Sequence, residues 1–194
     1  MDERTIGVAV AIPEPWGEDL QRRRERYGDP LAKAIPTHVT LLPPTRVPAG
    51  DLPGIDAHLR AVAEEQAPFE VLLRGTGTFR PVSPVVFVAL AVGISDCERV
   101  EARVRSGLLA RETPFPYHPH VTVAHDLPDD VLDRAFADLA AYDASFEVWG
   151  FSLYEHGPDG VWRPQRDYAF GLGHSGPVLA GPLLSAGEDP VPLG

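Results

Sequence analysis

A short motif of one histidine, one variable residue and one threonine occurs twice in this chain. The first copy is His38-Val39-Thr40-Leu41 and the second is His120-Val121-Thr122-Val123. Successive side chains of an extended strand point to opposite faces, so the histidine and the threonine of each copy share one face. A fold that brings these two faces together therefore places two imidazoles and two hydroxyls around one small volume.

This set of groups is suited to in-line cleavage of a phosphodiester. The reaction needs a base that takes a proton from the attacking oxygen and an acid that protonates the leaving oxygen. Histidine titrates near neutral pH, so one imidazole can start neutral and the other protonated. Threonine hydroxyls can donate hydrogen bonds to phosphoryl oxygens, where charge develops. We therefore predict His38 and His120 as the acid–base pair, in an order left open, Thr40 and Thr122 as phosphate donors, and no metal or other cofactor.

The paired motifs resemble the two signature motifs of the two-histidine phosphoesterase superfamily, in particular its bacterial 2′-5′ RNA ligase-like branch. The resemblance covers roughly residues 4 to 170. It implies a bilobal α+β fold with pseudo-two-fold symmetry, in which two mainly antiparallel sheets line a central cleft and helices lie outside. It also implies hydrolysis of 2′,3′-cyclic phosphate at RNA ends or of small nucleotides, and reversible 2′-5′ joining of RNA.

One position departs from the pattern of the ligase-like branch. Many members carry His-x-Thr-x-Ala-Arg at the second motif, whereas this chain has His125 in place of the arginine. Strand parity predicts that position 125 faces away from His120. The change should therefore affect substrate length and ligation more than the core chemistry.

Six further residues are weaker candidates for substrate binding. His118 shares the face of His120 if the proline between them does not bend the strand. Aromatic rings can stack on a base, and guanidinium groups match phosphate oxygens. The aromatic candidates are Tyr117, Phe115 and Phe79, and the arginine candidates are Arg80 and Arg166. Each of these six can equally be a core, rim or surface residue.

The arginines at positions 22, 23, 24 and 26 form the densest basic run of the chain. Acidic residues are interspersed with them on the same predicted helix. This mixture is typical of a solvated helix face.

Composition limits the architecture and the partners. The chain has 194 residues and a formal net charge of −11, which argues against a general binder of long nucleic acid. We expect one two-lobed domain over residues 1–170, a Gly/Pro-rich tail without fixed structure over 171–194, and a monomer. No stretch approaches the length of a membrane span, and the lone Cys97 cannot form an internal disulfide. The expected partner is an RNA terminus or a small cyclic nucleotide, in the cytoplasm, with no membrane contact.

Hydrophobic periodicity predicts an alternation of strands and helices. A strand over 35–42 is expected to end at Pro43-Pro44, and the Gly157-Pro158-Asp159-Gly160 turn is expected to join the last two strands. The other expected strands are 5–12, 69–79, 85–92, 115–125, 144–154 and 161–170, and the expected helices are 16–27, 51–66, 95–110 and 128–140.

Two other classes of function remain open at this stage. In a metal-dependent hydrolase, His118 and His120 would share one ion, completed by His125, His156 or His174. In a nucleotide-binding module without catalysis, the same groove would bind a ligand and leave it unchanged.

Overall fold

The computed structural model describes residues 2–171. The predicted tail therefore lies outside the described residues, except for Gly171. The strands are β1 (Glu3–Ala11), β2 (His38–Pro48), β3 (Phe69–Thr78), β4 (Val85–Val92), β5 (His120–His125), β6 (Asp143–Val148), β7 (Gly150–His156) and β8 (Trp162–Ala169). The helices are α1 (Trp16–Tyr27), α2 (Leu52–Glu64), α3 (Ile94–Val104) and α4 (Asp129–Asp138).

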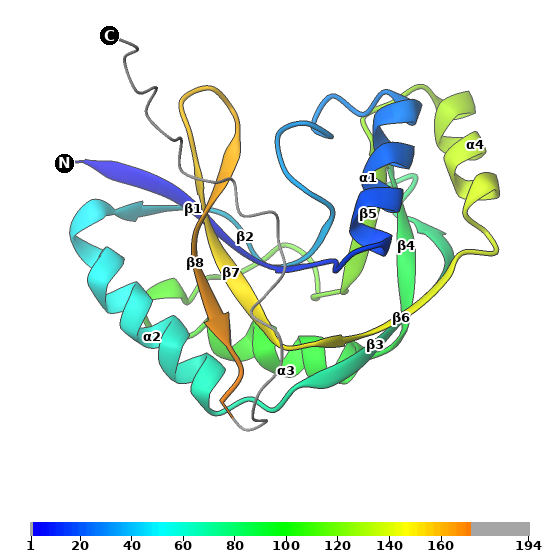
Figure 1. Ribbon diagram of the computed structural model, residues 1–194. Coiled ribbons are helices and arrows are strands. Elements are labelled where there is room, and N and C mark those ends of the chain that lie inside the picture. Colours follow the sequence, from blue (N-terminus) through cyan, green and yellow to red (C-terminus); the bar gives the residue numbers. More distant parts are fainter. Residues whose placement is uncertain (1, 172–194) are drawn as a thin grey trace, which may run out of the picture.

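The strands form one curled antiparallel sheet in the order β6-β3-β4-β5-β2-β1-β7-β8 (Figure 1). The prediction of two separate sheets is therefore wrong, although the expected antiparallel pairing is observed. The reason is a narrow joint: β2 and β5, the strands that carry the two motifs, pair at Val39 and Val121. This joint connects two groups of four strands, each of which resembles one of the expected sheets.

Two of the four helices described, α1 and α3, cross over between the two groups of strands. Helix α1 follows β1 in the chain but packs on β5, whereas α3 follows β4 but packs on β2. Helix α4 covers β3, β4 and β5, and α2 packs beside α3 and against β8. Figure 1 accordingly shows α1 and α4 on one side of the molecule and α2 and α3 on the other. Each half of the sheet is thus covered by a helix that belongs to the other half in sequence.

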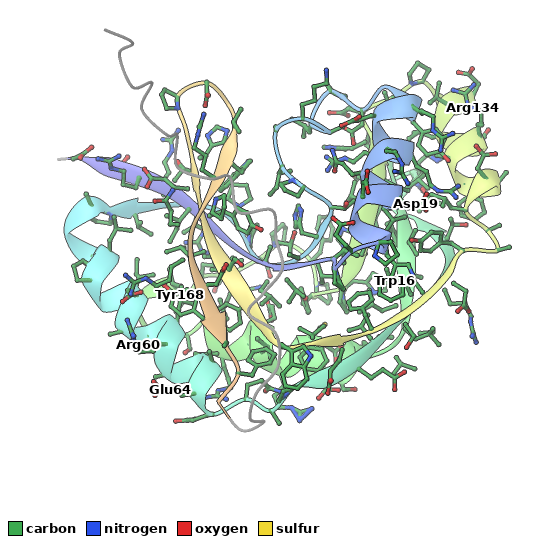
Figure 2. The ribbon with its side chains drawn as sticks, in the orientation of Figure 1. Trp16, Asp19, Arg60, Glu64, Arg134 and Tyr168 are labelled. Carbon is green, nitrogen blue, oxygen red and sulfur yellow. The ribbon has the colours of Figure 1, made fainter. Side chains whose placement is uncertain are left out.

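Helix α2 is fixed to the edge strand β8 by a single carboxylate. Asp56 accepts hydrogen bonds from the Tyr168 hydroxyl at 2.8 Å and from Arg166 at 3.0 Å. Arg60, one turn further along the helix, pairs with the same carboxylate (Figure 2). These groups hold the last strand of the sheet against the helix.

The predicted strand over 144–154 is two strands that separate at Trp149. Strand β6 pairs with β3 at one end of the sheet, whereas β7 pairs with β1 and β8 near the other end. The apolar alternation changes parity at the break, from Ala144, Phe146 and Val148 to Phe151 and Leu153. This local change does not indicate which strand the second segment pairs with. Gly150 marks the place, because a Cβ there would lie 2.2 Å from the Tyr168 carbonyl oxygen.

Strand β2 continues beyond the two prolines at which it was predicted to end. Its register with β1 shifts from Val8–Leu42 to Ile6–Thr45, which leaves Pro43 and Pro44 without direct partners. A proline has no N–H to donate, and a bulge is a position where a strand tolerates it. The second motif strand is shorter than predicted and begins at His120. Helix α3 is also shorter and ends at Val104.

We expect the joint between β2 and β5 to contribute to stability through its apolar side chains. Val39 and Val121 are 1% and 0% exposed. Val121→Ala should lower the free energy of unfolding by about 2 kcal/mol, because it removes two buried methyl groups and leaves a cavity. Val82→Ala is the matched control, since Val82 is 70% exposed and should change stability by less than about 0.5 kcal/mol. Urea denaturation of both variants measures the difference, and equal midpoints would contradict the expectation.

Candidate active site

The register of the joint sets the two motifs directly beside each other. Val39 pairs with Val121 in antiparallel strands, so His38 lies opposite Thr122 and Thr40 lies opposite His120. The two valines point into the core, whereas all four polar side chains are half-buried on the other face. Each histidine therefore has the threonine of the other motif as its cross-strand neighbour.

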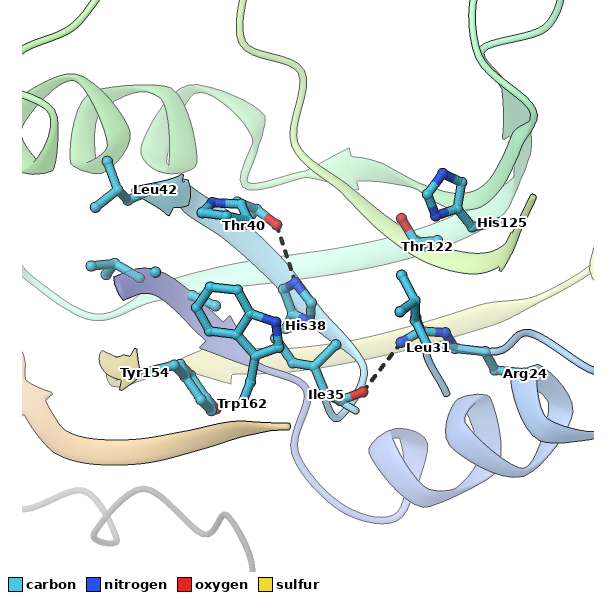
Figure 3. Close-up of a pocket in the computed structure, with 14 residues that line it drawn as sticks. Arg24, Leu31, Ile35, His38, Thr40, Leu42, Thr122, His125, Tyr154 and Trp162 are labelled. Carbon is cyan, nitrogen blue, oxygen red and sulfur yellow. Dashed lines mark hydrogen bonds between the residues drawn. The ribbon is translucent and has the colours of Figure 1, made fainter. Parts of the chain in front are cut away.

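Both imidazoles are oriented by a backbone carbonyl two residues earlier. Nδ1 of His38 lies 2.7 Å from the Pro36 carbonyl oxygen, and Nδ1 of His120 lies 2.7 Å from the His118 carbonyl oxygen. A carbonyl can only accept, so Nδ1 carries the proton in both rings. In neutral His38, Nε2 then accepts from the Thr40 hydroxyl at 3.1 Å (Figure 3). The repeat thus leaves Nε2 of each ring as the nitrogen that is available to exchange a proton.

Burial sets the protonation state of the pair. Burial, with smaller contributions from the positive charges of Arg24 and His120, lowers the pKa of His38 to about 4, although the hydrogen bond to Pro36 raises it. Burial also lowers the pKa of His120, with a smaller contribution from His118. Both rings are therefore mainly neutral at pH 7 in the free protein.

Aromatic rings close the side of the site around His120. The ring of Phe79 meets it edge-on at 4.9 Å between centroids, and the ring of Phe87 lies 5.2 Å away. Gly77 makes room for this packing, because a Cβ there would lie 2.4 Å from the Phe87 ring. His118 stacks beside His120 with ring centroids 6.3 Å apart.

A pocket of about 300 Å³ opens on the other side, around His38 (Figure 3). Three of the four polar motif residues line it, namely His38, Thr40 and Thr122. Its remaining walls come from β1, β2, the end of β5, helix α1 and the loop after it, and strands β7 and β8. The residues of these walls are Gly7, Val8, Ala9, Arg24, Leu31, Ile35, Leu42, Pro44, His125, Tyr154 and Trp162.

The structure corrects the predicted direction of His125. Phe87 pairs with Thr122 but Val86 pairs with Ala124, so β5 holds one extra residue at this point. Such a bulge reverses the alternation of faces beyond it. His125 therefore points to the same side as Thr122 and lines the pocket.

The aromatic candidates lie at different distances from the chemistry. Phe79 and His118 contact the ring of His120, as described above. The Tyr117 hydroxyl donates to the Thr40 carbonyl at 2.9 Å, and burial raises the pKa of Tyr117. Tyr117 thus supports the first motif strand. Phe115 is 62% exposed and is not among the described residues that line the pocket.

The two arginine candidates are held by carboxylates on helices. Arg80 pairs with Asp133 at 2.7 Å and with Asp129 at 3.4 Å, both on α4. Arg166 pairs with Asp56 on α2. The structure therefore does not bring either guanidinium into the pocket.

One arginine of the basic run is buried against the site instead of being solvated. Arg24 is 3% exposed and lines the pocket. Its Nε donates to Asp29 at 2.8 Å and its Nη1 to the Ile35 carbonyl at 3.2 Å. The signal was present in the sequence: Leu20, Arg24 and Tyr27 follow the i, i+4, i+7 spacing of one helix face. Trp162 and Tyr154 were also missed, because aromatic residues in strands usually belong to the core.

A metal site of the kind considered above is not assembled in the described part of the chain. Within residues 2–171, no three His, Cys, Asp or Glu side chains gather as ligands of one ion. His174, one of the residues considered for that site, lies outside this range. Among the same residues, no helix is both long and apolar enough to cross a membrane.

Comparison with known proteins agrees with the two motifs. Residues 12–160 match the family described as the 2′-5′ RNA ligase superfamily. A protein of Bacillus licheniformis named "Putative phosphoesterase" is 30% identical over 164 residues, which are 84% of this chain and 96% of that protein. One of the same name from Geobacillus kaustophilus is 27% identical over 168 residues, 85% of this chain and 95% of that protein.

Solved structures share the fold. The protein TT0787 of Thermus thermophilus superposes with a TM-score of 0.62 at 27% identity, covering 88% of this chain and 100% of that chain. LigT of Escherichia coli, in complex with NADP+, gives a TM-score of 0.63 at 18% identity, covering 88% and 99%. The resemblance that the two motifs indicated is thereby confirmed. The chain is a two-histidine phosphoesterase and belongs to the 2′-5′ RNA ligase superfamily.

Proposed function

We propose that this protein is a metal-independent phosphodiesterase that hydrolyses 2′,3′-cyclic phosphates, at RNA ends or of small nucleotides. His38 and His120 exchange the protons, one as base toward water and the other as acid toward the leaving ribose oxygen. Thr40 and Thr122 donate hydrogen bonds to the phosphoryl oxygens. The observation that carries the proposal is the crossed arrangement of the motifs, in which each histidine lies opposite the other motif's threonine.

Pocket size and charge favour a small substrate or a chain end. A pocket of about 300 Å³ is at the low end of the range for small-molecule sites, and the net charge of −11 disfavours long nucleic acid. E. coli LigT has been solved with 3′-AMP, ATP and phosphate. Of these ligands, 3′-AMP has the structure of a hydrolysis product of adenosine 2′,3′-cyclic phosphate, but the proposal rests on this chain's own residues.

Hydrolysis is proposed as the main reaction and ligation as a secondary one. Ligation must hold a second RNA end beside the first, which calls for additional phosphate contacts. His125 lines the pocket at the position where many ligase-like members have an arginine. An imidazole lacks the fork with which guanidinium binds a phosphate at two points.

Removal of either motif histidine should abolish most of the activity. We expect His38→Ala and His120→Ala each to lower kcat for a nucleoside 2′,3′-cyclic phosphate by about a hundredfold or more, because each removes one proton-transfer group. His58→Ala is the matched control, since His58 lies on α2 and its ring contacts the Val104 carbonyl. Turnover is measured with EDTA present. Full activity in either motif variant would contradict the assignment, and loss of wild-type activity in EDTA would contradict metal independence.

The leaving group should distinguish the acid from the base. A p-nitrophenyl phosphodiester releases an anion that needs no proton, so the histidine that acts as acid becomes dispensable. We compare the activity of each variant, His38→Ala and His120→Ala, with that of wild type on both substrates. For one variant this ratio should be at least about tenfold higher on the p-nitrophenyl diester than on the cyclic phosphate. The other variant should stay inactive on both. Release of p-nitrophenolate is followed by absorbance. Equal recovery of both variants, or of neither, would argue against an acid–base pair.

The pH profile should have its maximum on the acidic side. The productive form holds one neutral and one protonated imidazole. Activity falls below the pKa of His38, about 4, because both rings are then protonated. It falls again as the pH rises through the pKa of His120, which lies below 6.5, because both rings are then neutral. We expect kcat/KM to peak between these values, with circular dichroism at each pH as the check on folding. A maximum above pH 7 would contradict this expectation.

A further inference from the structure

We propose that Trp162 forms a stacking site for the nucleobase of the substrate, on the His38 side of the phosphate. This inference rests on the proposed function and goes beyond it, because it assigns a residue and a chemical group to the part of the pocket that takes no part in proton transfer. It also states on which side of the phosphate the nucleoside lies.

The indole of Trp162 is held in a fixed place at the start of β8. Its backbone N–H donates to the Ala34 carbonyl at 2.8 Å, which ties the strand to the loop after α1. Its ring packs beside the ring of His156, with centroids 4.8 Å apart. The ring edge lies over Gly7 of β1, where a Cβ would be 3.2 Å from the indole. A ring supported in this way needs little further ordering when a base stacks on it.

The pocket connects this indole to the reacting groups. Trp162 and Tyr154 line the same cavity as His38, Thr40 and Thr122 (Figure 3). The indole remains partly exposed, so a surface is available to a ligand. A nucleotide joins a charged phosphate to a flat apolar base, which matches a pocket lined both by polar groups and by aromatic rings.

The opposite side of the site, around His120, is lined by aromatic rings that pack against each other. Around His120, the rings of Phe79 and Phe87 lie within 4.9 Å and 5.2 Å of the imidazole. They pack against each other with centroids 4.5 Å apart. The packed rings of Phe79 and Phe87 thus line the His120 side, whereas the pocket that holds Trp162 opens on the His38 side.

Tryptophan fluorescence tests the proposal directly. The chain has three tryptophans, and Trp162 is the one among the described residues that lines the pocket. We expect 3′-AMP to quench the fluorescence of the full-length protein, because stacking brings the base onto the indole. Base-free ribose phosphate should give little quenching. Trp149→Phe is the matched control and should keep the quenching, whereas Trp162→Phe should lose it.

Affinity measured by calorimetry separates stacking from simple packing. Base–aromatic stacking contributes about 1–3 kcal/mol, so Trp162→Leu should weaken 3′-AMP binding by roughly 5- to 150-fold. Trp162→Phe keeps a ring and should stay within a few fold of wild type. The loss for 3′-AMP should exceed the loss for ribose phosphate at least about fivefold. If Trp162→Leu binds 3′-AMP as tightly as Trp162→Phe does, the proposal is overturned.

Kinetics then separates this proposal from the proposed function. Ethylene phosphate holds the same five-membered cyclic diester without a base. Trp162→Leu should raise KM for a nucleoside 2′,3′-cyclic phosphate at least about fivefold more than KM for ethylene phosphate. Equal changes on both substrates would overturn the stacking site and leave the phosphodiesterase intact. If wild type turns over neither substrate but binds 3′-AMP through Trp162, the proposed function fails and the stacking site stands.

Discussion

The site depends on one contact between two strands, the pairing of Val39 with Val121. This pair fixes the register in which the two motif strands run side by side. A slip of one residue would move a histidine and its threonine to the opposite face, into the core, and bring the valine out. The buried valines oppose that slip, because a shift by one residue would expose one of them to solvent. The apolar residue between histidine and threonine is therefore as necessary as the polar pair, although it takes no part in the chemistry.

A second constraint acts on the segments that lead into the motif strands. Each imidazole donates to a carbonyl in such a segment, so the segment must itself be rigid. On one side, Arg24 pairs with Asp29 and donates to the Ile35 carbonyl next to Pro36. On the other, Arg105 at the end of α3 pairs with Glu101 and donates to the Arg111 carbonyl at 3.0 Å. Both arginines stand at the end of the helix that precedes a motif strand. We infer that these two pairs, one buried and one partly buried, fix the conformation of the segments more than they add net stability.

A feature of the fold or of the site could be predicted from the sequence where neighbouring residues determine it. It could not be predicted where residues distant in the chain determine it. The order of strands and helices and the shared face of His38 and Thr40 followed from periodicity, which is a local signal. The single sheet, the split at Trp149 and the inward turn of His125 did not, because each depends on pairing with distant residues. The bulge that turns His125 is visible only against Val86 and Phe87 of β4. The burial of Arg24 could be predicted only in part. Its spacing from Leu20 and Tyr27 placed it on the apolar face of the helix, but its charge favoured an exposed position.

The repeat makes the reacting groups nearly equivalent, so the surroundings must break the symmetry. Phe79 and Phe87 close one side, and an open pocket occupies the other. Under the proposed function, this asymmetry would admit the substrate in one orientation and give each histidine a fixed role. Burial keeps both rings mainly neutral until a ligand arrives. The negative charge of a bound phosphodiester favours protonation of a nearby imidazole, since an opposite charge stabilises the charged form. Binding of the substrate would thus itself produce the acid that the reaction needs, and the free site would lack it at neutral pH.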